Sequence, residues 1–223
     1  MFETKYSKVL TILLIVIIVA IIILGGYLGY NYYKDYKTGD DSSKFVSTFA
    51  EEVGNTTGKG NTDATGTISD NIAASDTTSN SGKKTQTYKG YNVIGTIEIP
   101  KTNIKYPILE GPPTIKKLDT SVAALYPQNA EVNTEGNVVI SGHNYRNDLF
   151  FSNNKKLSNG DKIYITDLNG TKLSYTIYNI FQTEENDTSF YNRDTDGAKE
   201  ITLSTCSDDT SARLIVEAKA EYK

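Results

Sequence analysis

An apolar run near the N-terminus constrains this chain more than any other feature. Val9 to Leu24 is apolar except for Thr11, and Gly25 to Leu28 extends the run. About 20 helical residues rising about 1.5 Å each span about 30 Å, the thickness of a bilayer's hydrocarbon core. Tyrosines follow at once, where aromatic side chains meet the membrane–water interface. We therefore predict a short tail at residues 1–8 and a transmembrane anchor at residues 9–30.

A cleaved signal peptide is the alternative to an anchor. Signal peptides have shorter apolar cores and a small-residue cleavage site, and no A-x-A-like sequence follows here. Lysines flank both ends of the run, so the positive-inside rule is nearly balanced. Because so short an N-terminal tail normally stays inside, we expect a single-pass protein of the cell membrane whose main domain is extracellular.

Residues 31–87 are expected to form a flexible linker. Gly, Ser, Thr, Asn and Asp dominate from about Thr38 to Thr87. Such a stretch buries too little apolar surface to offset the entropy cost of ordering it. Phe45, Val46 and Phe49 indicate at most a short helical turn near its start. We predict a disordered tether with an average span of about 40 Å.

Residues 88–223 have the pattern of a folded β domain. Apolar and polar residues alternate, as in half-buried strands, in YNVIGTIEIP and DKIYITDLNGTKLSYTIYNIF. The Asn169-Gly170 pair favours a type I′ hairpin turn, and short helical turns are expected near 114–118 and after Asp148. Further short strands lie in NVVISG, EITLSTC and RLIVEAK. The pattern predicts an all-β fold, a closed or nearly closed barrel of seven to eight strands.

Composition excludes several classes of function. A net charge of -4, with no basic stripe and no Gly-Lys-Ser/Thr phosphate loop, argues against nucleic acid and nucleotides as partners. The chain has 1 Cys and 1 His, so it can form no internal disulfide and no Cys/His zinc cluster.

The single Cys and the single His occupy corresponding places in the pattern. His143 follows the strand that ends near Ile140, and Cys206 ends the strand that starts at Ile201. Arg213 opens the next strand, seven positions after Cys206, so a hairpin would return its guanidinium to the sulfur. A cation beside a thiol favours the reactive thiolate, imidazole transfers protons near neutral pH, and a guanidinium can stabilise an oxyanion.

Each of these residues has a structural alternative. An isolated Cys at a strand end is usually a small buried apolar side chain, and a solitary His is commonly a satisfied core or surface residue. Arg213 could pair with Asp208 or Asp209 across its loop. Only the combination of the three residues at strand ends favours chemistry.

Several local motifs resemble those of the sortase family. TLSTC followed by Arg213 resembles the TLxTC-type strand end that supplies the nucleophile of the family, and ISGHN resembles the strand end that supplies its His. VIGTIEIPKTNIKYPILEG resembles the opening strands, and LFFSNNKKLSNGDKIYI the F-x-x-x-x-x-L-x-x-G-D stretch. The resemblance covers residues 88–223 and implies a sortase-like barrel, which in that family usually follows an anchor and a tether.

The resemblance implies a cysteine transpeptidase that cleaves the C-terminal sorting signal of secreted surface proteins, commonly LPxTG, between Thr and Gly. Cys206 would form a thioacyl intermediate, His143 would exchange protons with the amines, and Arg213 would steady the oxyanion or hold the peptide. Ser204 and Thr205 would line the substrate groove. The acceptor would be an amine of a peptidoglycan precursor or a pilin Lys, with no metal or cofactor.

The resemblance leaves the subclass open. A lid motif and a second membrane span, both frequent in pilus-building members, are not visible in the sequence. The GHN sequence resembles the haem-acquisition class, although the long helical insertion of that class is missing. Four acidic residues resemble the calcium ligands of some housekeeping members: Glu131, Glu184, Glu185 and Asp187. A solvated acidic loop is the favoured interpretation of these residues.

Two rival functions remain open. A papain-like Cys peptidase would place its Cys before its His, at the start of a helix, whereas here His143 precedes Cys206 and Cys206 ends a strand. Hydrolysis without amine transfer is harder to separate from transpeptidation. A non-enzymatic tethered surface β-domain, such as an adhesin or structural module, would explain the anchor, linker and strands equally well.

Overall fold

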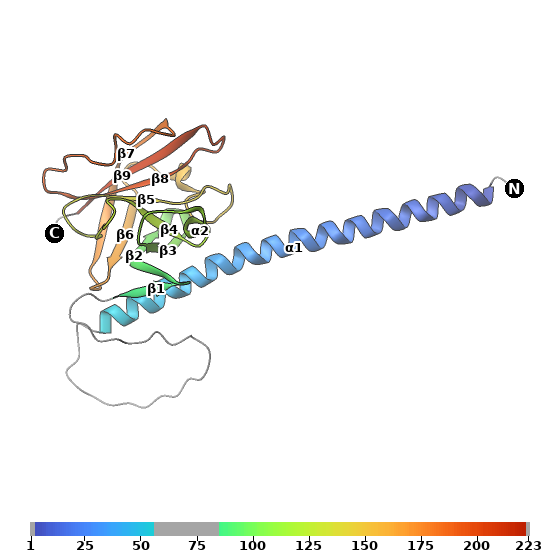
Figure 1. Ribbon diagram of the computed structural model, residues 1–223, viewed down its shortest axis with the longest axis horizontal. Helices are drawn as coiled ribbons and strands as arrows, with labels where there is room; N and C mark the ends of the chain where they lie inside the picture. The colour runs from blue at the N-terminus through green and yellow to red at the C-terminus, as the bar shows by residue number, and fades with distance from the viewer. Residues whose placement is uncertain (1–2, 56–84, 222–223) are drawn as a thin grey trace, which may run out of the picture. The chain divides into compact units, whose positions relative to one another are not determined.

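The structure is a computed structural model that describes residues 3–55 and 85–221 (Figure 1). Much of the predicted linker, residues 56–84, therefore lies outside the described residues. The helices and strands follow one another along the chain in this order: α1 (Glu3–Asn55), β1 (Gln86–Tyr88), β2 (Tyr91–Ile99), η1 (Pro100–Thr102), β3 (Ile104–Leu109), α2 (Ile115–Leu118), β4 (Val122–Tyr126), β5 (Gly136–Ser141), η2 (Asn154–Lys156), β6 (Lys162–Asp167), β7 (Lys172–Glu184), β8 (Lys199–Cys206) and β9 (Ala212–Ala220).

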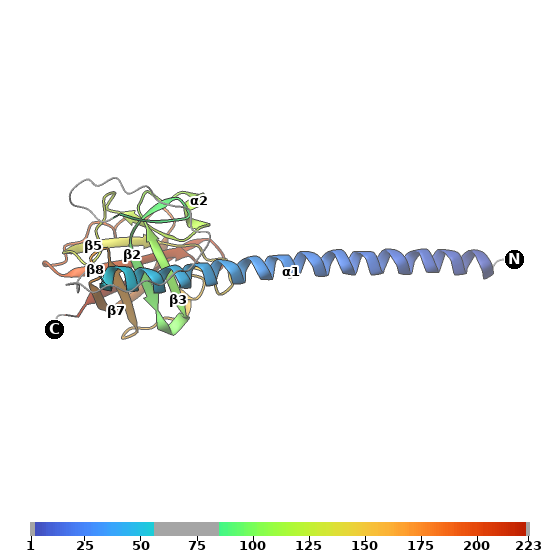
Figure 2. The same ribbon diagram turned by 90° about the horizontal axis from the view of Figure 1, so that it is seen from below.

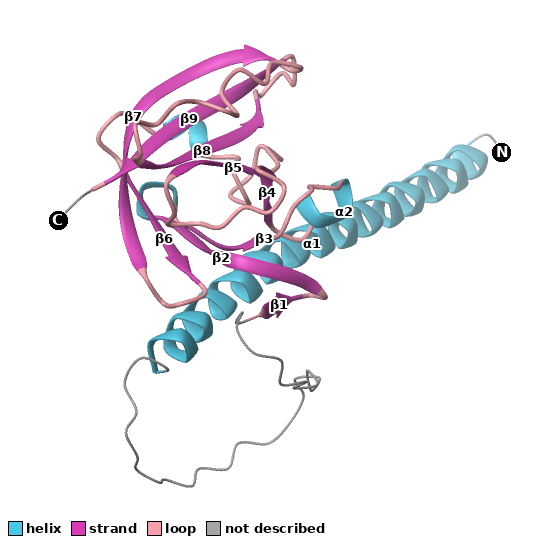
Figure 3. Cartoon of the chain, turned by 60° about the vertical axis from the view of Figure 1, so that its left-hand side comes forward, coloured by secondary structure: helices cyan, strands magenta, loops and turns pink. Residues whose placement is uncertain are grey.

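A ring of strands forms the body of the domain. Neighbouring strands are hydrogen-bonded in the order β2-β3-β4-β5-β8-β9-β7-β6, and pairing between β2 and β6 closes the ring (Figure 3). The short β1 pairs with β2 outside the ring. Two neighbouring pairs, β3–β4 and β5–β8, are parallel, and the other pairs are antiparallel. The predicted all-β fold with a closed barrel is confirmed.

The barrel interior is filled by branched aliphatic and aromatic side chains. Inward-facing positions of each strand alternate with outward-facing ones, as the pleat of a strand requires. Ile97, Ile140, Ile163, Tyr175 and Leu203 come from five different strands, and each is almost completely buried. The strands that bear the predicted functional residues are thus held by side chains of the same buried core.

The hairpin between β6 and β7 has the predicted strands but a different turn. Only Gly170 takes a positive φ, of 84°, whereas a type I′ turn needs positive φ at both central residues. The Asp167 carboxylate accepts hydrogen bonds from the backbone N–H groups of Asn169 and Thr171, at 2.8 and 2.9 Å. This Asx-type arrangement satisfies the loop backbone and selects a longer turn. The predicted type I′ turn is therefore wrong.

Short helical turns occur near both places where the sequence predicts them. α2 begins after Thr114, whose hydroxyl accepts a hydrogen bond from the Lys117 backbone N–H at 3.3 Å and so caps the helix. η2 follows the segment that starts at Asp148. Both turns lie in connections between strands, so they leave the barrel unbroken.

Residues 31–55 differ from the flexible linker expected there. α1 continues without a break through Asn55 (Figure 2). The polar composition suggested disorder, but Val46, Phe49 and Val53 recur at spacings of three and four residues, which is the period of one helix face. An apolar face of this kind stabilises a helix when it has a surface to pack against.

The barrel provides that surface for residues from Ser42 onward, which belong to the same compact unit as the barrel. Phe49 and Val53 are 2% and 4% exposed and pack with Tyr88, Val93 and Leu109. The Ser42 hydroxyl is 3.1 Å from the Tyr88 hydroxyl, and the Gln86 amide donates to Glu52 at 2.9 Å. The last turns of α1 are thus part of the folded domain and not a tether.

The N-terminal part of α1 is the apolar segment expected to form an anchor. Within the described residues, one helix is long and apolar enough to cross a membrane, and the qualifying stretch lies in Lys8–Val53. Its Val, Ile and Leu side chains between Val9 and Leu28 are exposed. An exposed apolar helix of this length has the composition of a membrane span.

Candidate active site

The hairpin of β8 and β9 places a thiol beside a guanidinium. Cys206 ends β8, and Arg213, near the start of β9, is its direct partner in the antiparallel register. Arg213 Nη1 donates a hydrogen bond to Cys206 Sγ. The sulfur belongs to a free, partly exposed cysteine. The hairpin thus holds a permanently charged, planar hydrogen-bond donor directly against the sulfur.

The strand β5 brings His143 to the same end of the barrel. β5 runs parallel to β8, with Ser141 opposite Ser204. The Gly142 N–H donates to the Ser204 carbonyl at 3.2 Å, so the pairing continues to the residue before His143. Gly142 has no room for a side chain, because an added Cβ would lie 2.7 Å from the Phe151 ring. Parallel neighbouring strands therefore deliver the imidazole and the thiol to one edge.

His143, Cys206 and Arg213 line one cleft of about 280 Å³. Leu118 and Leu125 supply apolar walls, and other lining residues come from the connection between β7 and β8. The structure thus brings together the three residues that the sequence singles out. The chemistry of this set is nucleophilic attack by sulfur, proton transfer by imidazole and stabilisation of negative charge by a guanidinium.

Ser204 and Thr205, the predicted groove residues, also border this cleft but are 4% and 3% exposed. The Thr205 hydroxyl donates to the Gly142 carbonyl at 2.8 Å. This bond ties the residue before Cys206 to the residue before His143. Thr205 therefore contributes to the site mainly by holding the two strand ends together.

The sequence reasoning missed two residues that surround His143. Asp119, at the end of α2, places its Oδ1 atom 3.2 Å from His143 Nε2. Tyr145 stacks on the imidazole, with ring centroids 4.8 Å apart, and its hydroxyl donates to the same Asp119 oxygen. No sequence pattern marks Asp119 as functional, since the contact depends on how the β3–β4 connection folds over the strand ends.

Asn144 is a third residue that was missed, and it contacts the backbone of Cys206. Its amide donates to the Cys206 carbonyl and to Asp208 Oδ1, both at 3.0 Å. Lys155 donates to Asp208 Oδ2 at 2.6 Å. The hydrogen bonds that Asp208 accepts from Lys155 and Asn144 lower the pKa of its carboxyl group, and the bond from Lys155 has the larger effect. The only available signal was its position next to His143 in the GHN sequence.

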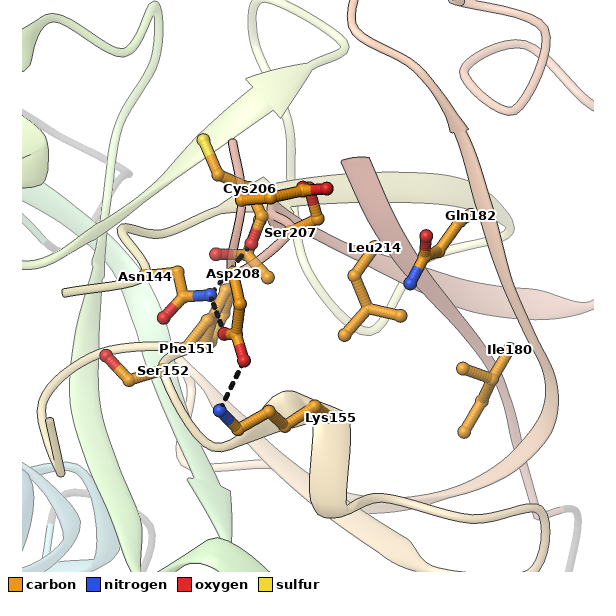
Figure 4. Close-up of a pocket in the computed structure, with 12 residues that line it drawn as sticks. Asn144, Phe151, Ser152, Lys155, Ile180, Gln182, Cys206, Ser207, Asp208 and Leu214 are labelled. Atoms are coloured by element: carbon orange, nitrogen blue, oxygen red, sulfur yellow. Dashed lines mark hydrogen bonds and ion pairs between the residues drawn. The ribbon is translucent and has the colours of Figure 1, made fainter. Parts of the chain in front are cut away.

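This network lines a second cleft of about 380 Å³ on the other side of Cys206. Figure 4 shows the Cys206 sulfur pointing away from the Asn144, Asp208 and Lys155 side chains. Cys206 thus lines both clefts, and His143 and Arg213 line the one of about 280 Å³.

The acidic residues of the β7–β8 connection have partners within the chain. Glu185 accepts from Arg213 Nη2 at 2.6 Å. Asp187 accepts from the Thr183 hydroxyl and from the Ser189 backbone N–H, and these bonds lower its pKa, that of Thr183 most. Among residues 3–55 and 85–221, no group of three or more His, Cys, Asp or Glu side chains is arranged to hold a metal ion.

An ionic network anchors the same connection to the barrel. Arg193 pairs with Glu200 at 2.6 Å and with Glu217 at 3.1 Å, and both carboxylates are nearly buried. The Asn137 amide donates to the carbonyls of Phe190 and Tyr191 at 3.0 and 3.1 Å. Phe190 and Tyr191 are thereby held as a wall of the cleft that contains Cys206.

Comparison with known proteins assigns the family. Residues 97–221, more than half of this 223-residue chain, match the family model described as Sortase domain. The chain belongs to the sortase family. Sortase A of Staphylococcus aureus is 30% identical over 118 residues, which are 52% of this chain and 56% of that protein. Sortase A of Bacillus anthracis is 32% identical over 127 residues, or 56% of this chain and 58% of that protein.

A solved sortase structure is also similar. The structure of a Clostridium perfringens sortase D5 transpeptidase superposes with a TM-score of 0.52 at 34% identity, covering 58% of this chain and 79% of that one. The chain spans a little over half the length of the curated sortases that it matches. The cleft thus belongs to a sortase domain, and α1 lies outside residues 97–221 that match the family model.

Proposed function

We propose that this chain is a sortase-type transpeptidase that cleaves an LPxTG-like C-terminal sorting signal of surface proteins and transfers the protein to an amine. The observation that carries the proposal is the contact of Arg213 with the Cys206 sulfur in a cleft shared with His143. A cysteine with only a packing role has no need of a guanidinium on its sulfur. Family membership supports the same reaction.

In the proposed reaction, the Cys206 thiolate attacks the carbonyl carbon of the substrate Thr. Arg213 stabilises the negative oxygen of the tetrahedral intermediate by charge and hydrogen bonding. The C–N bond then breaks, His143 gives a proton to the departing Gly amine, and a thioester remains on Cys206.

The second half of the reaction uses the same groups in reverse. An incoming amine attacks the thioester carbon and gives its proton to His143, and the thiolate leaves as the new amide forms. The acceptor is an amine of a peptidoglycan precursor or a pilin Lys. The cycle involves no net oxidation and needs no cofactor.

We propose that residues 9–30 hold the enzyme in the cell membrane as a single span, with the catalytic domain outside the cell. The exposed apolar side chains between Val9 and Leu28 support this location. Secreted proteins that carry a sorting signal would pass close to a domain held in this way.

The test is to offer the full chain, in detergent micelles, a library of LPxTG-like peptides with and without a Gly-type amine. We expect a product cleaved after Thr and joined to the amine, identified by mass. Cleavage without transfer at saturating amine would favour a peptidase. No cleavage of any peptide, together with a thiol that resists alkylation until unfolding, would favour a non-enzymatic surface domain.

A further inference from the structure

The ring of His143 presents its two nitrogens to different surroundings. Nε2 is shielded from solvent and forms no hydrogen bond. Asp119 Oδ1 is 3.2 Å away, but the contact lies outside hydrogen-bond geometry. A buried polar nitrogen without a hydrogen-bond partner is energetically costly. Because the Asp119 carboxylate is so near, a small rotation of the ring or of the carboxylate would give Nε2 that partner.

Asp119 is held in place for that bond. As the C-cap of α2, it uses its backbone N–H to bond the Ile115 and Lys117 carbonyls. The Tyr145 hydroxyl donates to Asp119 Oδ1, and the Tyr145 ring stacks on the imidazole of His143. One tyrosine therefore fixes both the carboxylate and the plane of the ring that faces it.

We propose that Asp119 is a positioning residue for His143 and that His143 exchanges protons with substrate through Nδ1. This inference rests on the proposed transpeptidase function. Nε2 is enclosed and cannot reach a substrate amine. An acceptor-only carboxylate at Nε2 selects the tautomer with a proton on Nε2, which leaves the lone pair of Nδ1 free.

The proton transfers then have a definite atom. His143 protonated on both nitrogens gives the Nδ1 proton to the departing amine, and neutral Nδ1 takes a proton from the incoming amine. Nε2 keeps its proton throughout and donates to Asp119.

The other charged groups at the cleft have separate roles. Arg213 and Glu185 form an ion pair with each other, and Asp187 accepts from Thr183. Cys206 contacts Arg213. Asp119 is the carboxylate that the structure places against the His143 ring.

The tautomer can be observed without turnover. The chain contains 1 His, so ¹⁵N labelling of histidine in the full chain, in micelles, gives one pair of ring-nitrogen signals. At a pH where the ring is neutral, we expect a protonated Nε2 and a bare Nδ1. Asp119→Ala should shift the population toward the opposite tautomer, Tyr145→Phe should do so less, and Asp119→Glu should restore part of the original population. Asp148→Ala removes an exposed carboxylate of the same region and should leave the spectrum unchanged.

Kinetics supply the second readout. Asp119→Ala should lower transfer roughly tenfold to a hundredfold, mainly in kcat, since the residue acts on proton transfer and not on peptide binding. A wild-type ring protonated on Nδ1, or identical spectra for wild type and Asp119→Ala, would overturn the inference even if transfer occurs. If the wild type transfers nothing while the spectra behave as expected, the proposed function fails and the Asp119–His143 pairing stands.

Discussion

The hairpin side and the loop side of the candidate active site are built in different ways. Cys206 and Arg213 face each other across one antiparallel hairpin, and their positions follow from strand register. Asp119, His143 and Asn144 lie at or beyond the ends of regular elements, and each is held by side-chain contacts to distant residues. Strand register therefore sets the positions of Cys206 and Arg213 and brings His143 to the same edge, whereas loop contacts orient the His143 ring. We expect changes in the hairpin to remove chemistry and changes in the loops to weaken it.

The largest effect is expected in the hairpin at Cys206. Cys206→Ala should reduce transfer below detection, because no other group in the proposed mechanism can form the thioester. The variant should unfold at the same denaturant concentration as wild type, which circular dichroism can check. Measurable turnover in this variant would remove the nucleophile assignment.

Arg213→Lys tests whether the hairpin supplies geometry as well as charge. An ammonium cannot contact both Cys206 Sγ and Glu185 as the planar fork does. We expect kcat to fall by roughly a hundredfold to a thousandfold, as when one oxyanion donor is lost. Glu185→Gln keeps the guanidinium and serves as the control, and it should lower kcat less than Arg213→Lys does. Near-normal rates for Arg213→Lys would make the residue structural.

The packing of α1 on the barrel can be tested by Phe49→Ala. Phe49 is 2% exposed in the cluster with Val53 and Tyr88, so truncation should reduce the free energy of unfolding by about 3 kcal/mol. Tyr36→Ala, at a position 65% exposed on the same helix, is the control and should change little. If the two variants unfold alike in a denaturant titration, residues 42–55 are not part of the folded domain.

Substitutions in the loops around His143 should lower the rate of transfer less than substitutions in the hairpin. Asn144→Ala removes the donor to the Cys206 carbonyl and should lower kcat roughly tenfold, with a stability loss of about 1 kcal/mol. Asn153→Ala removes a half-buried side chain whose amide donates to Asp148, and it should have almost no effect on transfer. Equal rates for the two variants would mean that the loop does not position the nucleophile.

The smallest effect concerns the turn of the hairpin itself. Asp209 accepts hydrogen bonds from the Ser207 hydroxyl and the Ser211 backbone N–H. These bonds lower the pKa of Asp209 from 3.8 to about 2, and the bond from Ser207 has the largest effect. Because the folded value lies below the ordinary one, the carboxylate stabilises the turn above pH 3.8 and loses that contribution as the pH falls toward about 2. Hydrogen exchange of residues 207–211 should therefore differ between wild type and Asp209→Asn at pH 5 and converge near pH 2. A constant difference would contradict this assignment.

The same contrast explains what the sequence could predict. Strand alternation, with the lone Cys, the lone His and Arg213 at strand ends, was enough to predict the barrel and three residues that line its cleft, because register is a local property of strands. Asp119 and Asn144 could not be found in this way, since their contacts join segments far apart in sequence. The helix at 31–55 was missed for a related reason: Phe49 and Val53 stabilise it only through the barrel surface that they cover. The catalytic roles of His143, Cys206 and Arg213 remain proposals.

The most direct test of the account is to trap the acyl-enzyme. The full chain is mixed with an LPxTG-like peptide in the absence of an amine. The reaction is quenched with acid, and the intact mass of the protein is measured by mass spectrometry. We predict an adduct equal to the peptide up to its Thr, located on Cys206 by peptide mapping and discharged by adding a Gly-type amine. Cleaved peptide with no adduct on Cys206, or an adduct on another residue, would contradict the convergence of sulfur, imidazole and guanidinium into one reaction centre.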